Sequence, residues 1–238
     1  MIGILDWGIG GLFALQALRR RQPTADVVYL SDAGNTPYGR QSRRELARSV
    51  DRGLGVLRDH GATQILVACH SASTVLPLLA APDAVGVIAP EHVPRGGRIA
   101  VLGGVRTVRS QVWRRALVGH GTVVQRIAQP LSAAVEAGAL DSARTRELVR
   151  RLLEPVKQAD TVVLACTHYT AVAPLIAECT PGARLVDPAL ARAETLELPP
   201  GSGGALALTT GDPQSVNAVL EKMTGMGAVD QVVWFVRL

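Results

Sequence analysis

Two cysteines, Cys69 and Cys166, stand out because each directly follows an apolar run of strand character. Each is followed within two positions by a histidine, His70 or His168, and by hydroxyl side chains, in a segment that could begin a helix. Ligand sites in open α/β sheets lie just beyond the carboxyl ends of strands, and a helix N-terminus favours the thiolate form of cysteine. Two such thiols could place one acid/base on each face of a substrate, which is the chemistry of a racemase that needs no cofactor.

The alternatives for these cysteines are less specific. Most free cysteines are small buried hydrophobic residues, and this is our interpretation of Cys179, which lies near the expected end of a helix. A hydrolase could use Cys69 alone with a nearby base and carboxylate, but it leaves the second cysteine segment unexplained. No metal is expected, because the cysteines and histidines show no ligand spacing pattern.

The overall composition indicates a globular protein that acts on a small molecule. The chain has 238 residues, of which 47% are hydrophobic, enough for one large domain or two small ones. The net charge of +5 comes largely from short arginine clusters, which we interpret as solvated helix faces, because no basic tail or aromatic-studded basic stripe predicts nucleic-acid binding. A mildly positive protein would suit a small anionic substrate.

The location expected from the sequence is the cytoplasm. Three cysteines without a CxxC pattern argue against a disulfide framework and favour a reducing compartment. The N-terminus lacks the basic and long apolar regions of a signal peptide. No apolar run approaches the roughly 20 residues that cross a bilayer, so no membrane association is expected.

Short Val/Ile/Leu-rich runs alternate with longer Ala/Leu/Arg segments of helical period. The sequence predicts strands over 2–6, 27–31, 64–69, 84–88, 98–103, 122–128, 161–166, 184–186, 205–209 and 231–235. Helices are expected over 12–21, 110–117 and 130–138, from a Ser42 cap to about residue 60, and from an Asp141 cap to residue 157. This alternation predicts an α/β fold with mainly parallel sheets covered by helices on both faces.

Two linker-like stretches, 91–97 and 198–204, divide the chain. We therefore expect two pseudo-symmetric α/β domains, the first formed by 1–93 plus 205–238 and the second by 94–204. The active site would lie in the cleft between them and take one thiol from each.

The glycines of Gly8-Ile9-Gly10-Gly11 follow the first strand, but they do not form a dinucleotide-binding fingerprint, because Phe13 stands where the third glycine belongs. We interpret them as a tight turn whose backbone N–H groups face the cleft at a helix N-terminus, where a carboxylate would bind. Asp6 ends the preceding apolar run, which is a costly place for a charge without a function.

Taken in order, these segments resemble the glutamate racemase family of the aspartate/glutamate racemase superfamily over nearly the whole chain. The matching segments are Asp6–Gly11, Ser31-Asp32, Pro37-Tyr38-Gly39, Ala68–Ala72, Gly103–Ser110, Pro130-Leu131 with Val135-Glu136, Ala165–Tyr169 and Thr209–Asp212.

The resemblance implies reversible inversion of glutamate without pyridoxal phosphate or metal, supplying D-glutamate for peptidoglycan, by a protein we expect to be a homodimer. It implies that Cys69 and Cys166 are the acid/base pair, Asp6 and His168 their respective partners, and Asp32 and Glu136 further catalytic acids. The substrate-binding residues predicted on this basis are Trp7, Pro37, Tyr38, Gly39, His70, Ser71, Thr107 and Thr167.

Some positions depart from the family pattern: Trp7 replaces Ser, His70 replaces Asn and Gly104 replaces Thr, while Ser71 replaces Thr but keeps the hydroxyl. The acid/base residues are retained, whereas part of the substrate cradle is rebuilt. Two alternatives therefore stand beside glutamate racemisation. One is a racemase or isomerase of the same superfamily acting on aspartate or another small carboxylate, and the other is a non-catalytic descendant that binds a ligand between its domains.

Overall fold

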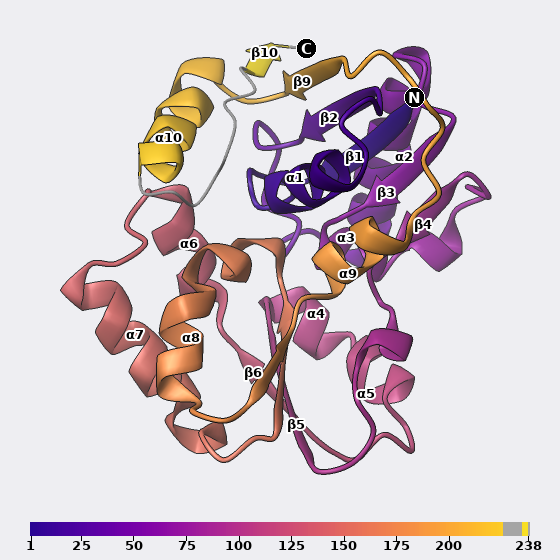
Figure 1. Cartoon of the computed structure of the whole chain (residues 1–238). Helices are drawn as coiled ribbons and strands as arrows, with labels where there is room; N and C mark the ends of the chain where they lie inside the picture. The colour runs from indigo at the N-terminus through magenta and orange to yellow at the C-terminus, as the bar shows by residue number, and fades with distance from the viewer. Residues whose placement is uncertain (226–234, 238) are drawn as a thin grey trace.

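The computed structural model describes residues 1–225 and 235–237, and it contains two parallel β-sheets (Figure 1). The six-stranded sheet has the order β10-β9-β2-β1-β3-β4, with β1 Ile2–Asp6, β2 Val27–Ser31, β3 Gln64–Val67, β4 Ala84–Gly86, β9 Ala205–Thr209 and β10 Phe235–Arg237. The four-stranded sheet has the order β6-β5-β7-β8, with β5 Arg98–Gly103, β6 Thr122–Ile127, β7 Thr161–Ala165 and β8 Arg184–Val186. The predicted α/β class with parallel sheets is confirmed.

Helices flank both sheets (Figure 1). They are α1 Leu12–Arg21, α2 Arg43–Asp59, α3 His70–Ser73, α4 Val105–Arg109, α5 Val112–Ala116, α6 Gln129–Glu136, α7 Ala143–Leu153, α8 Ala173–Cys179, α9 Pro188–Thr195 and α10 Pro213–Gly225. Short 3₁₀ turns are η1 Leu76–Leu78, η2 Pro90–His92, η3 Glu154–Val156 and η4 Thr167–Val172. No helix in the described part of the chain is long and apolar enough to cross a membrane.

The strands at the centre of each sheet explain why the two sheets form. Every residue of β1, β2 and β7 is buried. Strands covered on both faces read as nearly continuous runs of Val, Ile and Leu, because no position alternates toward water. The long helix α2 begins where the sequence predicts, with a capping box in which Ser42 and Glu45 satisfy each other's backbone N–H groups.

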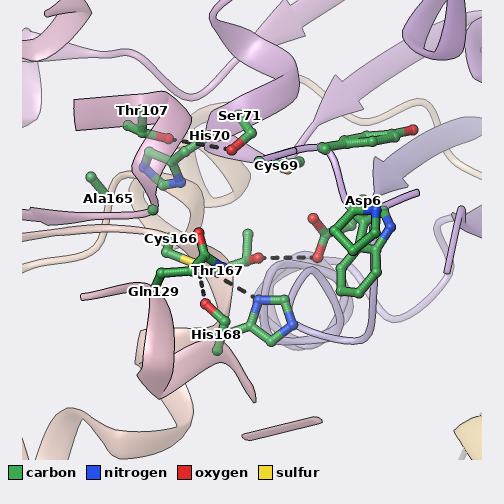
Figure 2. Close-up of a pocket in the computed structure, with 16 residues that line it drawn as sticks. Asp6, Cys69, His70, Ser71, Thr107, Gln129, Ala165, Cys166, Thr167 and His168 are labelled. Atoms are coloured by element: carbon green, nitrogen blue, oxygen red, sulfur yellow. Dashed lines mark hydrogen bonds between the residues drawn. The ribbon is translucent and has the colours of Figure 1, made fainter. Parts of the chain in front are cut away.

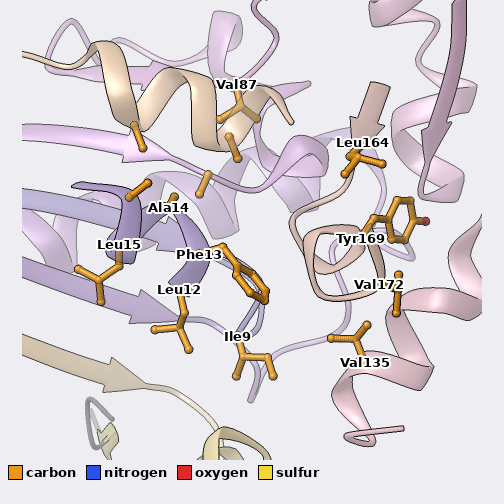
Figure 3. Close-up of a cluster of buried hydrophobic side chains, with 14 of the residues drawn as sticks. Ile9, Leu12, Phe13, Ala14, Leu15, Val87, Val135, Leu164, Tyr169 and Val172 are labelled. Carbon is orange, nitrogen blue, oxygen red and sulfur yellow. The ribbon is translucent and has the colours of Figure 1, made fainter. Parts of the chain in front are cut away.

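One apolar cluster runs from the first sheet's helix α1 into the elements of the second sheet (Figure 3). Ile9 and Phe13 belong to the same cluster as Val135, Tyr169 and Val172. Helix α9, which follows the last strand of the second sheet, also packs on α1. The two sheets are therefore joined by a shared hydrophobic core beside the polar loops that follow β1 and β7.

Two predicted helices are shorter in the structure, and one predicted strand is only partly described. The helix expected over 110–117 is α5, which begins only at Val112, because Gln111 adopts a left-handed backbone conformation with φ 57° and separates α5 from the preceding helix α4. The N-cap of α7 is Ser142 and not Asp141, and Pro155 ends the helix early by starting a 3₁₀ turn. Of the strand expected over 231–235, residues 231–234 lie outside the described residues, and β10 begins at Phe235.

Candidate active site

A pocket lies at the carboxyl ends of the strands of both sheets (Figure 2). Its walls are residues at or after the ends of β1, β2 and β3 of the first sheet and of β5, β6 and β7 of the second. Parallel strands bring their carboxyl ends to one edge of a sheet, so two facing edges collect polar loops from distant parts of the sequence. The pocket therefore has one wall from each half of the chain.

Cys69 enters the pocket at the N-cap position of the short helix α3. Its side chain is buried, and burial raises the pKa of the thiol well above its ordinary value. The nearby Asp6 carboxylate raises the pKa further, and the backbone N–H groups of Ser71 and Ala72 oppose the shift without cancelling it. Cys69 is therefore a protonated thiol at rest.

Asp6 ends β1 and is almost completely buried. Its Oδ2 accepts hydrogen bonds from the backbone N–H of Gly11 at 2.6 Å and from the Thr167 hydroxyl at 3.0 Å. Burial raises the pKa of Asp6, and the charge of His168 together with these hydrogen bonds opposes the rise only in part. The Gly8–Gly11 turn thus holds this chain's own carboxylate, and Thr167 ties that carboxylate to the other half.

Cys166 has a different environment, with a base beside it. Its Sγ lies 3.4 Å from the Ser132 hydroxyl and 3.6 Å from His168 Nδ1. The opposite ring nitrogen of His168 is hydrogen-bonded to Glu136 Oε1, which also accepts the backbone N–H of Ile9 at 3.4 Å. Glu136, His168 and Cys166 thus form a continuous relay.

The charges in this relay stabilise one another. Burial opposes protonation of His168, but its hydrogen bonds to Cys166 and Glu136, and their charges, outweigh burial and raise its pKa well above 6.5. Burial likewise works against ionisation of Glu136, but the hydrogen bond and charge of His168 hold its pKa below the ordinary 4.5. The pair is therefore imidazolium and carboxylate at neutral pH, with the imidazolium beside the Cys166 sulfur.

Asp32 does not line the pocket. Its Oδ2 accepts the hydroxyl of Tyr38 at 2.9 Å, and its Oδ1 accepts from Asn35 Nδ2 at 2.6 Å and from the Thr210 hydroxyl at 3.0 Å. Tyr38 does line the pocket, with Pro37 and Gly39. Asp32 therefore acts on the pocket through the loop that carries Tyr38.

The remaining predicted binding residues all line the pocket. Trp7 is half-buried, and its indole Nε1 donates to the backbone oxygen of Asn35 at 3.2 Å, so the large side chain is fixed to the wall of the first half. Across the cleft, the hydroxyls of Ser71 and Thr107 lie 3.5 Å apart. Trp7 thus belongs to the pocket lining and does not point away from it.

His70 is buried, and neither ring nitrogen has a hydrogen-bond partner among the described residues. Its ring lies against that of Trp113 with centroids 6.1 Å apart and an interplanar angle of 33°. Burial alone lowers the pKa of His70 to about 3. The histidine beside Cys69 is consequently neutral and cannot act as a second imidazolium.

Gln129 and Ser132 line the pocket, and the sequence-based prediction missed both. They lie on α6, where positions 129, 132 and 136 share one face at helical spacing. The signal for them was present, since Glu136 was already a candidate and the residues one and two turns before it on the same face are polar.

Two thiols from opposite walls, one paired with a buried carboxylate and the other with an imidazolium, can remove a proton on one side of a substrate and return one on the other. Fold and site together define an isomerase of the two-base type. The chain belongs to the Asp/Glu/hydantoin racemase family, whose model matches residues 14–196.

Relatives and solved structures agree with this assignment. A curated glutamate racemase from Gloeobacter violaceus is 35% identical over 215 residues, covering 84% of this chain and 81% of the relative. The glutamate racemase of Thermus thermophilus, solved with β-chloro-D-alanine, is 30% identical with a TM-score of 0.83, covering 100% of this chain and 96% of that one. A glutamate racemase isoform from Bacillus anthracis has a TM-score of 0.87 at 25% identity, with 100% and 97% coverage.

Proposed function

We propose that this protein is a glutamate racemase that interconverts L- and D-glutamate with two thiols and no cofactor. The observation that carries the proposal is the pocket in which Cys69 and Cys166 enter from different halves of the chain. The proposal is supported by relatives named glutamate racemase that match more than four fifths of this chain.

In the proposed mechanism, the Cys166 thiolate removes the α-proton of one enantiomer. The imidazolium of His168 and the hydroxyl of Ser132 stabilise that thiolate before the step. The Cys69 thiol then donates its proton to the opposite face of the carbanion, and its own charge develops beside Asp6. The other enantiomer reacts through the same states in reverse order, with the Cys69 thiolate as the base and the Cys166 thiol as the acid.

The other predicted site residues divide into two groups. Tyr38, Gly39, Ser71, Thr107 and Thr167 offer hydroxyl and backbone groups that can hold the amino and carboxylate groups of the substrate. Asp32 and Glu136 act as positioning residues, because each contacts a pocket residue and does not itself line the pocket.

Further features of the enzyme belong to the same proposal. The first domain comprises 1–93 plus 205–238 and the second 94–204, in line with the residues that supply the two sheets. The enzyme functions as a homodimer. It works in the cytoplasm, where its thiols stay reduced, and it supplies D-glutamate for peptidoglycan.

The proposal is tested by exchange of the α-proton. Purified protein is incubated with L-glutamate in deuterated water, and loss of the α-proton signal is followed by NMR together with the appearance of D-glutamate. Exchange with inversion is expected, and Cys69→Ser and Cys166→Ser should each abolish inversion. Cys179→Ser is the matched control, because this thiol lies outside the pocket and should be dispensable.

Other outcomes distinguish the alternatives. Exchange with aspartate or another small carboxylate, but not with glutamate, would keep the mechanism and replace the substrate; the bulky Trp7 in the pocket wall is the observation that favours this second candidate. Activity that survives Cys166→Ala would indicate a hydrolase using Cys69 alone. No exchange with any amino acid would leave a non-catalytic ligand-binding protein.

A further inference from the structure

Gln129 is a pocket residue whose identity the proposed function leaves unexplained. It is the first residue of α6, and it lines the pocket with Cys166 and Thr107 (Figure 2). Its Oε1 accepts a hydrogen bond from the backbone N–H of Val105 at 3.2 Å, at the start of α4. A second element therefore fixes the orientation of the carboxamide.

Gly104 is the reason that the carboxamide fits. A Cβ atom built on Gly104 would lie 2.9 Å from Gln129 Oε1, so the carboxamide at the flexible end of the glutamine would have to move from its present position. A Cβ atom on Gly39, from the other half of the chain, would lie 3.3 Å from the same oxygen. Position 104 is also where the sequence departs from the threonine of the family it resembles. Here the Gln129 carboxamide occupies the space that a threonine side chain would need.

The nitrogen of this carboxamide is available for a ligand. Oε1 is engaged by Val105, and no hydrogen bond within residues 1–225 and 235–237 uses Nε2. The nitrogen of a carboxamide carries two donors and no acceptor. The pocket lining described contains neither Lys nor Arg, so apart from the imidazolium of His168 the groups that can donate to an anionic substrate there are neutral.

We infer that Gln129 is a specificity-determining residue, which donates a hydrogen bond from Nε2 to a carboxylate oxygen of the amino-acid substrate. This inference rests on the proposed function and deepens it, because it explains what the glycine at position 104 does for substrate binding. The glycine removes a short side chain, and the glutamine supplies a longer donor from α6.

Two replacements of nearly equal size separate a substrate contact from a structural role. Gln129→Met removes the donor, and Gln129→Glu keeps the acceptor for the Val105 N–H but presents a negative charge to the substrate. We expect Gln129→Met to raise KM for glutamate about ten- to a hundredfold, the factor that a hydrogen bond to a charged group supplies, with little change in kcat. Gln129→Glu should raise KM further, whereas a purely structural role predicts that it resembles wild type.

A double-mutant cycle tests the pairing with Gly104. Gly104→Ala should raise KM by displacing the carboxamide, and it should add little in the Gln129→Met background, because the same interaction is already lost. The matched control is Gln158→Met, since Gln158 accepts a hydrogen bond from Arg98 away from the pocket and should keep wild-type KM. Thermal unfolding of each variant reports whether the fold is retained.

Failure of this inference differs from failure of the proposed function. Suppose that the wild-type protein catalyses exchange. An unchanged KM in both Gln129 variants, or in Gln129→Glu alone, would then overturn the role of Gln129 and leave the proposed function standing. Calorimetric titration with glutamate gives Kd in parallel, so the same comparison holds for a protein that binds without turnover. Absence of both exchange and binding in the wild type would overturn both.

Discussion

Replacing Glu136 with Gln removes one charge from the relay at Cys166 while leaving its shape in place. Glu136 lies behind His168 and outside the pocket lining, so the substrate loses no direct contact. Its carboxylate is one of the causes that raise the pKa of His168. The variant therefore lowers the pKa of His168 and weakens the imidazolium that stabilises the Cys166 thiolate.

The size of the effect follows from the burial of the pair. A hydrogen bond to an ionised partner contributes about 1.5–3 kcal/mol, against about 1 kcal/mol for a neutral one. The difference is about 0.5–2 kcal/mol, and because the Glu136 side chain is only 28% exposed and the His168 side chain 5%, screening is incomplete and the loss lies in the upper part of this range. A loss of about 1.4 kcal/mol is a tenfold change in rate, so kcat/KM should fall about tenfold at neutral pH.

The assay follows circular dichroism of each enantiomer from pH 6 to 9. Because enantiomers have equal free energy in water, kcat/KM must fall by the same factor in both directions. The variant should affect the two thiols unequally. The kinetic isotope effect measured with α-deuterated substrate should be larger in the variant than in the wild type for the enantiomer that Cys166 deprotonates. The alkaline limb of the pH profile should move to lower pH, because the pKa of His168 falls in the variant.

The control is Glu147→Gln, which removes a carboxylate that is exposed on α7 and bound to Arg150. It should leave the kinetics unchanged. If Glu136→Gln kept kcat/KM within twofold of wild type and left the alkaline limb in place, the relay would have no part in catalysis.

His70→Asn should reduce the loss of stability in acid. Burial lowers the pKa of His70 to about 3, so the wild-type protein loses stability as the pH falls from 6.5 toward 3. Urea unfolding at pH 7 and pH 4.5 should therefore show a smaller drop in unfolding free energy for the variant than for the wild type. Thr167→Val removes the hydroxyl that donates to Asp6 at 3.0 Å and should lower kcat about tenfold, whereas Thr167→Ser should stay near wild type; equal rates in both would contradict this. Gly10→Ala would place a Cβ 2.5 Å from Thr167 Oγ1 and 2.7 Å from the backbone nitrogen of His168, so we expect a loss of about 1–3 kcal/mol in unfolding free energy. An unchanged thermal midpoint would show that the two halves are farther apart at Gly10 than the structure has them.

The strands could be predicted closely because each depends on a local signal. Five strands, β1, β2, β5, β8 and β9, begin and end where the apolar runs do. The start of α2 followed from Ser42 and Glu45, which form a complete local motif. The break at Gln111 could not be predicted, because a left-handed glutamine is imposed by tertiary packing and carries no glycine or proline signal. The cap of α7 was off by one because Asp141 and Ser142 are both good capping residues.

The site could be predicted for those functional residues that directly follow the carboxyl end of a strand. Cys69 and Cys166 lie in one pocket, as their positions after β3 and β7 indicated. The sequence did not show that Asp32 binds Tyr38 behind the pocket wall, because that depends on how a loop folds back. It also did not reveal Gln129, whose position depends on contact with Val105 from another element.

The apolar cluster that joins the two halves has a consequence for how the halves can separate. Ile9, Phe13 and Tyr169 belong to this apolar cluster (Figure 3), whereas at the pocket the hydroxyls of Ser71 and Thr107 make a polar contact between the two halves. Breaking polar contacts lets water replace them, but parting the apolar cluster would expose hydrocarbon at a cost of about 25 cal/mol for each Å². Separating the two halves beside Ser71 and Thr107 therefore costs less free energy than separating them at the shared core.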